Sequence, residues 1–124
     1  MLSDYPTYTT LPAGNLERAR EFYEVRLGFK PKTVSTAGVM YEAKGTTIFV
    51  YPSTFAGTNQ ATAVGFAVDD LPARVAELKA RGVSFEEYDF PGHKTVDSMM
   101  STPEGSSAWF KDSEGNIVGL FQMS

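Results

Sequence analysis

The sequence predicts an α+β protein made of two similar halves. A polar turn over residues 112–115 separates two apolar segments, residues 106–111 and 116–122, and this pattern is typical of a β-hairpin. Residues 41–51 hold a weaker copy of the same pattern, with Gly45 in the turn. In each half, a helical stripe of apolar residues precedes the hairpin. Two such hairpins in a short chain indicate an internal duplication.

The first half begins with a strand and a helix. Residues 7–11 contain Thr and Tyr, which favour a pleated strand. Asn15 is a suitable helix N-cap, and Gly28 and Pro31 are suited to end the helix. Between these signals, apolar residues recur at helical spacing and predict one buried stripe: Leu16, Ala19, Phe22, Tyr23 and Leu27.

Short strands complete the first half. Residues 34–43 predict one or two strands, interrupted near Gly38. Residues 46–51 predict a further strand, which Pro52 ends. The polar residues 53–59 then form a connector near the middle of the chain.

The second half repeats this order. Residues 63–68 predict a strand, and residues 70–82 predict a helix with its N-cap residue and its terminal glycine. Residues 83–90 are predicted as a strand and residues 91–100 as a polar loop, and the hairpin described above follows. The element order is therefore β-α-β-β-β, a linker, and β-α-β-β-β.

We interpret the 124 residues as one domain built from two modules. Module 1 covers about residues 1–58 and module 2 about residues 61–124. Asn15 and Asp70 open the two helices at equivalent places.

Composition excludes several classes of function. The chain has no cysteine, so it has no disulfide and no thiolate metal site, which fits the reducing cytoplasm where we expect it. A net charge of −4 argues against a nucleic-acid partner. No apolar stretch approaches the roughly 20 residues of a membrane span, so no membrane partner is expected.

Three motifs carry a resemblance to a known family: residues 15–23 with residues 27–29, residues 66–71, and residues 110–116. At these motifs the chain resembles the vicinal oxygen chelate superfamily, which includes glyoxalase I, bleomycin-resistance proteins and extradiol dioxygenases. The resemblance implies two βαβββ modules whose curled mixed sheets surround a cleft, with the helices on the outer face. It also implies a homodimer that commonly completes the cleft.

The chemistry of that family usually depends on a divalent metal held by two histidines and by carboxylates or glutamine. The resemblance places the ligand positions on Tyr8, Phe49, Ala63 and Gly119, none of which is a good metal ligand. One histidine and no cysteine cannot supply a two-histidine site. We therefore predict no metal and no cofactor.

Strand alternation predicts which residues face the cleft. It turns Val118 and Leu120, and also Ile48 and Val50, toward the helices. The cleft-facing residues are then Tyr8, Thr10, Phe49, Tyr51, Ala63, Gly65, Ala67, Trp109, Ile117, Gly119 and Phe121. Small residues of module 2 would leave volume, and aromatic faces hold planar or apolar ligands. The alternative is that these aromatic residues fill a dimer interface or the core.

His93, the only histidine, lies in the predicted loop of module 2. A lone histidine in a loop is commonly solvated. The functional interpretation makes the loop a lid, with His93 as a ligand contact or as an acid or base near neutral pH, and with Asp97 as an orienting carboxylate. Glu86 and Glu87 are neighbours on a predicted strand, so they should point to opposite faces and form no shared dyad.

Two classes of function follow. The first is a metal-free binding protein of the bleomycin-resistance type, a homodimer that holds an apolar or aromatic small molecule in the cleft between modules or between subunits. The alternative is an enzyme of the same superfamily, of lyase, isomerase or dioxygenase type, that uses His93 or an atypical metal site. The sequence features favour the binding protein.

Overall fold

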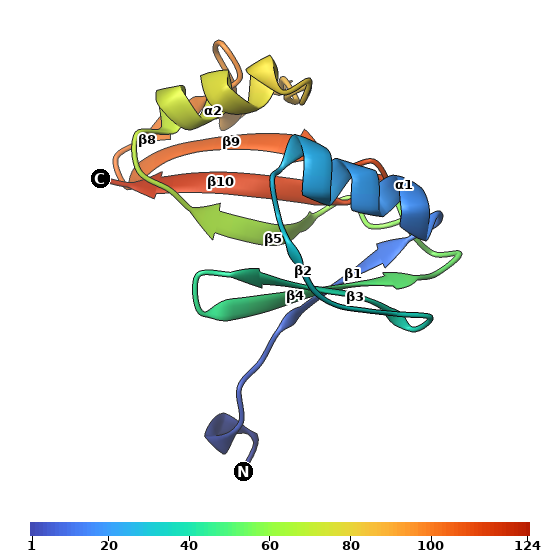
Figure 1. The fold of residues 1–124 in the computed structure, drawn as a ribbon. Helices are drawn as coiled ribbons and strands as arrows, with labels where there is room; N and C mark the ends of the chain where they lie inside the picture. The colour runs from blue at the N-terminus through green and yellow to red at the C-terminus, as the bar shows by residue number, and fades with distance from the viewer.

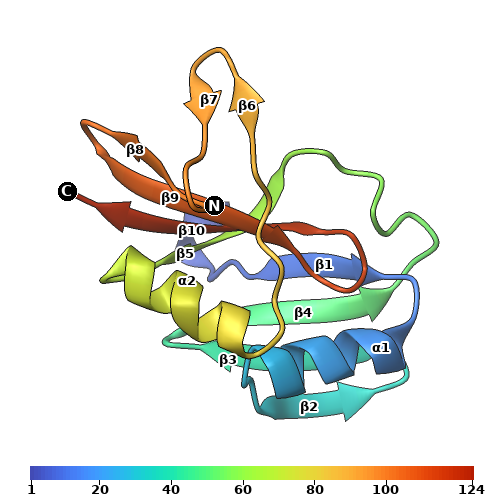
Figure 2. The ribbon, with the colours of Figure 1, turned by 90° about the horizontal axis from the view of Figure 1, so that it is seen from above.

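Two four-stranded mixed sheets, each with a helix against one face, make up the protein (Figures 1 and 2). The structure, a computed structural model, describes all residues from 1 to 124. The first sheet has the strand order β1-β4-β3-β2, and β1 is parallel to β4 whereas the other pairs are antiparallel. Its strands are β1 (Thr9–Ala13), β2 (Pro31–Ser35), β3 (Gly38–Ala43) and β4 (Thr46–Pro52).

The second sheet repeats this topology with the order β5-β10-β9-β8. Its strands are β5 (Thr62–Ala67), β8 (Met100–Thr102), β9 (Gly105–Lys111) and β10 (Ile117–Met123). Here β5 is parallel to β10, as β1 is to β4. The predicted α+β fold with two βαβββ modules is confirmed. A small hairpin, β6 (Asp89–Phe90) with β7 (His93–Lys94), projects beside the second sheet (Figure 2).

Each helix begins at the predicted N-cap residue. The Asn15 side chain accepts a hydrogen bond from the Arg18 backbone ahead of α1 (Leu16–Glu21), and Asp70 caps α2 (Leu71–Ala80) in the same way. A π-helical segment, η2 (Phe22–Arg26), prolongs α1, and a short 3₁₀ turn, η1 (Leu2–Asp4), lies near the N-terminus. None of the helices is long and apolar enough to cross a bilayer.

The predicted helix-facing residues form two adjoining cores. Ile48 and Val50 are buried in the core of the first module, and Val118 and Leu120 in that of the second. Four partly buried residues pack against both cores: Phe22, Leu27, Val64 and Phe66. The two modules therefore share a continuous apolar contact on their helical sides.

One element of the second module differs from the prediction. Residues 83–90 were expected to form a strand, but this segment makes only an isolated bridge, from Phe85 to Phe110 of β9, and the pairing of its end, Asp89–Phe90, with β7. The edge position of the sheet is taken by β8, which begins at Met100, the last residue of the predicted loop. The chain leaves the sheet after Glu86, whose backbone N–H donates to the Trp109 carbonyl at 2.8 Å. Glu87 then accepts hydrogen bonds from the side chains of Thr95 and Ser98, at 2.6 and 3.0 Å. These side-chain hydrogen bonds hold the segment in a projecting hairpin instead of a sheet edge.

The predicted turn of the last hairpin joins the two modules. Its Asp112 accepts hydrogen bonds from the backbone N–H groups of Glu114 and Asn116, at 2.8 and 2.9 Å, and from the Tyr23 hydroxyl at 2.6 Å. Gly115 has a φ of 88°, which glycine adopts at little cost. The turn is therefore fixed both internally and by a residue of the first helical segment.

Candidate ligand-binding site

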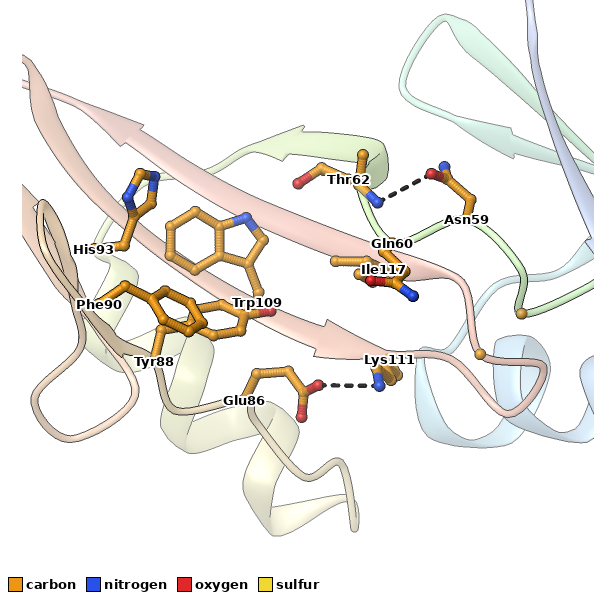
Figure 3. A pocket seen from close by; sticks show the side chains of 13 residues that line it. Asn59, Gln60, Thr62, Glu86, Tyr88, Phe90, His93, Trp109, Lys111 and Ile117 are labelled. Carbon is orange, nitrogen blue, oxygen red and sulfur yellow. Dashed lines mark hydrogen bonds and ion pairs between the residues drawn. The ribbon is translucent and has the colours of Figure 1, made fainter.

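The face of the second sheet that lies away from α2 carries a pocket of about 590 Å³ (Figure 3). Ala108 and Phe110 of β9 are buried in the core against α2, so the alternation of the strand places Trp109 between them on the opposite face. Residues 57–62 of the linker border the pocket on one side, and residues 86–93 border it on the other. We call this space the Trp109 pocket.

Aromatic side chains form one wall of the Trp109 pocket. The rings of Trp109 and Tyr88 meet edge to face, with centroids 5.6 Å apart. Tyr88 in turn stacks on Phe90 at 5.8 Å and an interplanar angle of 27°. Such an arrangement leaves aromatic faces and edges available to a planar molecule.

Phe121 supports this wall from β10. Its ring packs edge to face on Trp109 at a centroid distance of 6.1 Å. A methyl group added at Gly119 or Gly65 would lie 2.5 or 2.8 Å from the Phe121 ring. The two glycines were expected to leave volume for a ligand. Instead, the ring of Phe121 occupies that volume, because only glycine allows it to lie so close to the sheet.

Polar groups lie at the edges of the pocket. Lys111, two residues after Trp109 on the same strand, forms an ion pair with Glu86 at 3.5 Å (Figure 3). Burial, together with the negative charge of Glu86, raises the pKa of the Tyr88 hydroxyl, so this group stays protonated and can donate a hydrogen bond. His93 lies beside Trp109, at the end of the pocket away from Lys111 (Figure 3). The pocket thus offers donors, acceptors and both signs of charge around an aromatic centre.

The structure brings together only part of the predicted site. His93 and Trp109 line the same pocket, and Phe121 lies behind Trp109 with Gly119 and Gly65 beneath its ring. Tyr8 lines a different pocket of about 680 Å³, which Gly65 also borders. The remaining predicted aromatic residues, Phe49 and Tyr51, stack on each other at 6.0 Å on β4 of the first sheet, with Thr10 paired to Phe49.

Ala63 does not face the predicted cleft. It packs against the core of the first module. The pairing of β5 with β10 shifts at this point, since Ile117 lies opposite Thr62 and Val118 lies opposite Val64. Ala63 is therefore the extra residue of a β-bulge, and a bulge disturbs the alternation on which the prediction depended.

Sequence reasoning missed most of the polar and linker residues of the Trp109 pocket. Tyr88 and Phe90 were assigned to a strand of the sheet, Asn59 to a plain connector, and Gln60 to no element. One signal was available for Lys111. Because it is two residues from Trp109 on a strand, alternation places both on one face.

The residues at the family's metal positions do not fit a divalent ion. The resemblance placed these positions on Tyr8, Phe49, Ala63 and Gly119, whereas the strand pairing sets Thr10 opposite Phe49 and Gly65 opposite Gly119. None of these six residues carries a carboxylate or an imidazole. No group of three or more His, Cys, Asp or Glu side chains in the chain is arranged to hold a metal.

Comparison with known proteins identifies the family. Residues 6–120 match the family described as the Glyoxalase/Bleomycin resistance protein/Dioxygenase superfamily, and the chain belongs to this superfamily. A comparison with curated protein sequences gave no match.

Solved structures share the fold over nearly the whole chain. The crystal structure of UcmS2 is 17% identical, covers 94% of this chain and 96% of its own, and has a TM-score of 0.76. TnmS3, an antibiotic binding protein from Streptomyces sp. CB03234, is 25% identical over 97% of this chain and 96% of its own, with a TM-score of 0.64. FosX, a fosfomycin resistance protein from Listeria monocytogenes, is 15% identical over 97% of this chain and 93% of its own, with a TM-score of 0.68.

Proposed function

We propose that the protein is a metal-independent binding protein that holds a planar aromatic small molecule in the Trp109 pocket. The observation that carries this proposal is the joining of an aromatic wall, made by Trp109, Tyr88 and Phe90, to a nearby ion pair. At about 590 Å³ the pocket has the size of a small-molecule site, and polar side chains that can orient a ligand surround its aromatic wall. The similarity to TnmS3, an antibiotic binding protein, supports the same class of function.

The ligand of this proposal is planar and carries hydrogen-bonding groups at its edge. Its ring lies on Trp109. Carbonyl groups on its edge accept hydrogen bonds from Lys111, and hydroxyl groups on its edge donate hydrogen bonds to Glu86. The ion pair between Lys111 and Glu86, at 3.5 Å, is loose enough to admit such a third polar group. His93 donates a hydrogen bond at the opposite end and does no chemistry.

A homodimer is part of the proposal. The N-terminal segment, residues 1–8, runs away from both sheets (Figure 1). Its apolar side chains are largely exposed, with Leu2 at 85%, Tyr5 at 68% and Tyr8 at 55%. A second copy would cover this surface. Sedimentation equilibrium should give twice the chain mass, and a monomer at high micromolar concentration would contradict this part of the proposal.

Catalysis by His93 is the alternative, because its side chain lines the pocket beside Trp109. A catalytic histidine needs a partner that orients it, and Asp97, the candidate for that role, does not line the pocket. Turnover that requires His93 and changes with a pH midpoint between about 5 and 8 would favour the enzyme.

The test is a fluorescence titration with 1,4-naphthoquinone, a planar quencher whose carbonyl groups suit Lys111. Trp109 is the only tryptophan, so quenching reports on this site, and the chain has no thiol that the quinone could alkylate. We expect saturable quenching that is unchanged by excess chelator. Tyr88→Ala should weaken binding by roughly 1 to 3 kcal/mol through lost aromatic contact.

Phe49→Ala is the matched control, since it removes an aromatic side chain that is half-buried, as Tyr88 is, from the other sheet. We expect its affinity to equal that of the wild type. If Phe49→Ala weakened binding as much as Tyr88→Ala, the ligand would lie in a cleft shared by both sheets instead of in the Trp109 pocket.

A further inference from the structure

The pocket of about 680 Å³ that Tyr8 lines lies between the outer strands of the two sheets, β1 and β5. Its other walls are the start of β4, Phe29 and the turn between β3 and β4, which carries Lys44. Figure 1 shows this turn opposite the C-terminal end of β5. We call this space the Lys44 pocket. It shares no lining residue with the Trp109 pocket, so the two are separate sites.

Apolar side chains from both modules line the Lys44 pocket. Ile48 comes from β4, and Val64 and Phe66 come from β5. The rings of Phe66 and Phe29 lie with their centroids 6.1 Å apart and their planes tilted by 42°. Ile48 is part of the core of the first module and the other three residues pack against that core, so the fold itself holds this wall in place. A ligand with an apolar, ring-containing body gains affinity by burying it here.

The charge of the Lys44 pocket is positive. Lys44 is the one charged side chain that lines it, and none of the ion pairs of the protein includes Lys44. A neighbouring hollow shares Phe29 and Lys44 with the pocket and adds Lys30, Lys32 and Glu42. Three lysines and one glutamate give this end of the pocket a net charge of +2, although the whole chain has a net charge of −4. Charge complementarity therefore selects an anion, and the single lysine of the pocket itself suits a single negative charge.

The backbone of Lys44 is a second observation that points to its side chain. Lys44 and Gly45 are the two residues between β3 and β4, and their φ angles are 37° and 84°. Two-residue hairpin turns with positive φ favour asparagine or glycine, because most other residues are strained there. Turn propensity therefore does not account for a lysine at this position. A cation that serves the pocket does account for it, since such strain is retained where a side chain has a function.

We propose that the Lys44 pocket binds a small monocarboxylate with an apolar body, of the arylalkanoic acid class. The ring and chain lie against Ile48, Val64 and Phe66, and the carboxylate accepts a hydrogen bond from the Nζ of Lys44. Lys30 and Lys32 add a positive field that attracts the anion to the pocket. This site does not depend on the ligand of the Trp109 pocket.

The probes are 4-phenylbutyrate and 4-phenyl-1-butanol, because they share the ring and the chain and differ in the charged group. The full chain is titrated at pH 7 in its native oligomeric state, and the methyl NMR signals of Ile48 and Val64 report on the pocket. We expect saturable shifts, with the acid binding at least fivefold more tightly than the alcohol at low salt, and a ratio that falls as salt is added. Lys44→Asn removes the cation and suits the positive φ of the turn, so it should keep the fold and bring the ratio below twofold.

Two further variants separate this site from its alternatives. Ala67→Phe, at an exposed position of β5 that lines the pocket, fills the space and should abolish the shifts. Lys111→Met removes the cation of the Trp109 pocket and should leave both affinities unchanged. The proposal is overturned if the methyl signals do not shift, if the alcohol binds as tightly as the acid, or if Lys44→Asn keeps the preference for the acid. Intermolecular NOEs that place residues 1–8 of a second copy in the pocket of the free protein would also overturn it.

Discussion

Replacement of Glu114 by glutamine should remove a pH-dependent part of the stability. The Glu114 side chain is fully shielded from solvent, and it accepts hydrogen bonds from Asn15 N–H at 2.9 Å and from the Arg18 guanidinium at 2.8 and 2.9 Å. Ser113 adds another at 2.7 Å. Burial alone would raise the pKa of the Glu114 carboxyl, but these hydrogen bonds outweigh it and lower the pKa from 4.5 to about 2.

The magnitude follows from the change in pKa. A pKa that is lower in the folded protein means that the ionised form stabilises the fold above pH 4.5, and that this contribution is lost as the pH falls toward 2. At ~1.4 kcal/mol per pKa unit the contribution is about 3 kcal/mol at most. Arg18 is 56% exposed, so solvent screening reduces the expected loss in Glu114→Gln to about 2 kcal/mol at pH 7.

Urea unfolding of the wild type and of Glu114→Gln between pH 7 and pH 3 measures this effect. The difference in unfolding free energy should be about 2 kcal/mol at pH 7 and should shrink below pH 4.5. Glu17→Gln, on the exposed side of the same helix, is the control and should change the unfolding free energy by less than about 0.5 kcal/mol. A difference for Glu114→Gln that stays constant down to pH 3 would refute the assignment of the stabilisation to the ionised carboxylate.

Three further outcomes are expected. Tyr23→Phe should lower the unfolding free energy by about 1 to 3 kcal/mol in the same urea assay, because it removes a buried hydrogen bond of 2.6 Å to a carboxylate, and an unchanged midpoint would contradict this. Gly119→Ala should weaken naphthoquinone binding about fivefold, since the new methyl group displaces the Phe121 ring that supports the aromatic wall, and wild-type affinity would show that this support is unimportant. His93→Asn, which keeps a donor, should leave the affinity within about tenfold, or 1.4 kcal/mol, whereas a larger loss would make His93 a principal contact.

The sequence was sufficient for the fold because its signals are local and repeated. Asn15 and Asp70 cap the helices, and the last hairpin forms where the turn residues predict it. Alternation also assigned Val118 and Leu120 to the core correctly. Each of these features depends on neighbours in the chain, so periodicity and capping rules detect it.

The candidate site was less predictable because it depends on departures from regular geometry. The β-bulge at Ala63 turns this side chain toward the core of the first module, whereas regular alternation placed it on the cleft face. The hydrogen bonds that Glu87 accepts from Thr95 and Ser98 hold residues 87–98 away from the edge of the sheet. The same departure moves Tyr88 next to Trp109. These effects arise from contacts between segments distant in sequence or from side-chain hydrogen bonds, and no local pattern in the chain specifies them.

The contribution of Arg18 illustrates the same limit. In the sequence, Arg18 occupies the position where a capping box would have glutamate. In the structure, the glutamate comes from the last hairpin of the other module, since Glu114 accepts the hydrogen bond from the Asn15 backbone N–H. A cap completed from 99 residues away cannot be deduced from helix signals alone.

The central claim, that the ligand binds in the Trp109 pocket without a metal, is tested most directly by locating the bound probe. Intermolecular NOEs to 1,4-naphthoquinone should be recorded with a chelator present throughout. We predict NOEs to the indole protons of Trp109 and the ring protons of Tyr88. NOEs to Phe49 and Tyr51 instead, or binding that disappears with the chelator, would contradict the account.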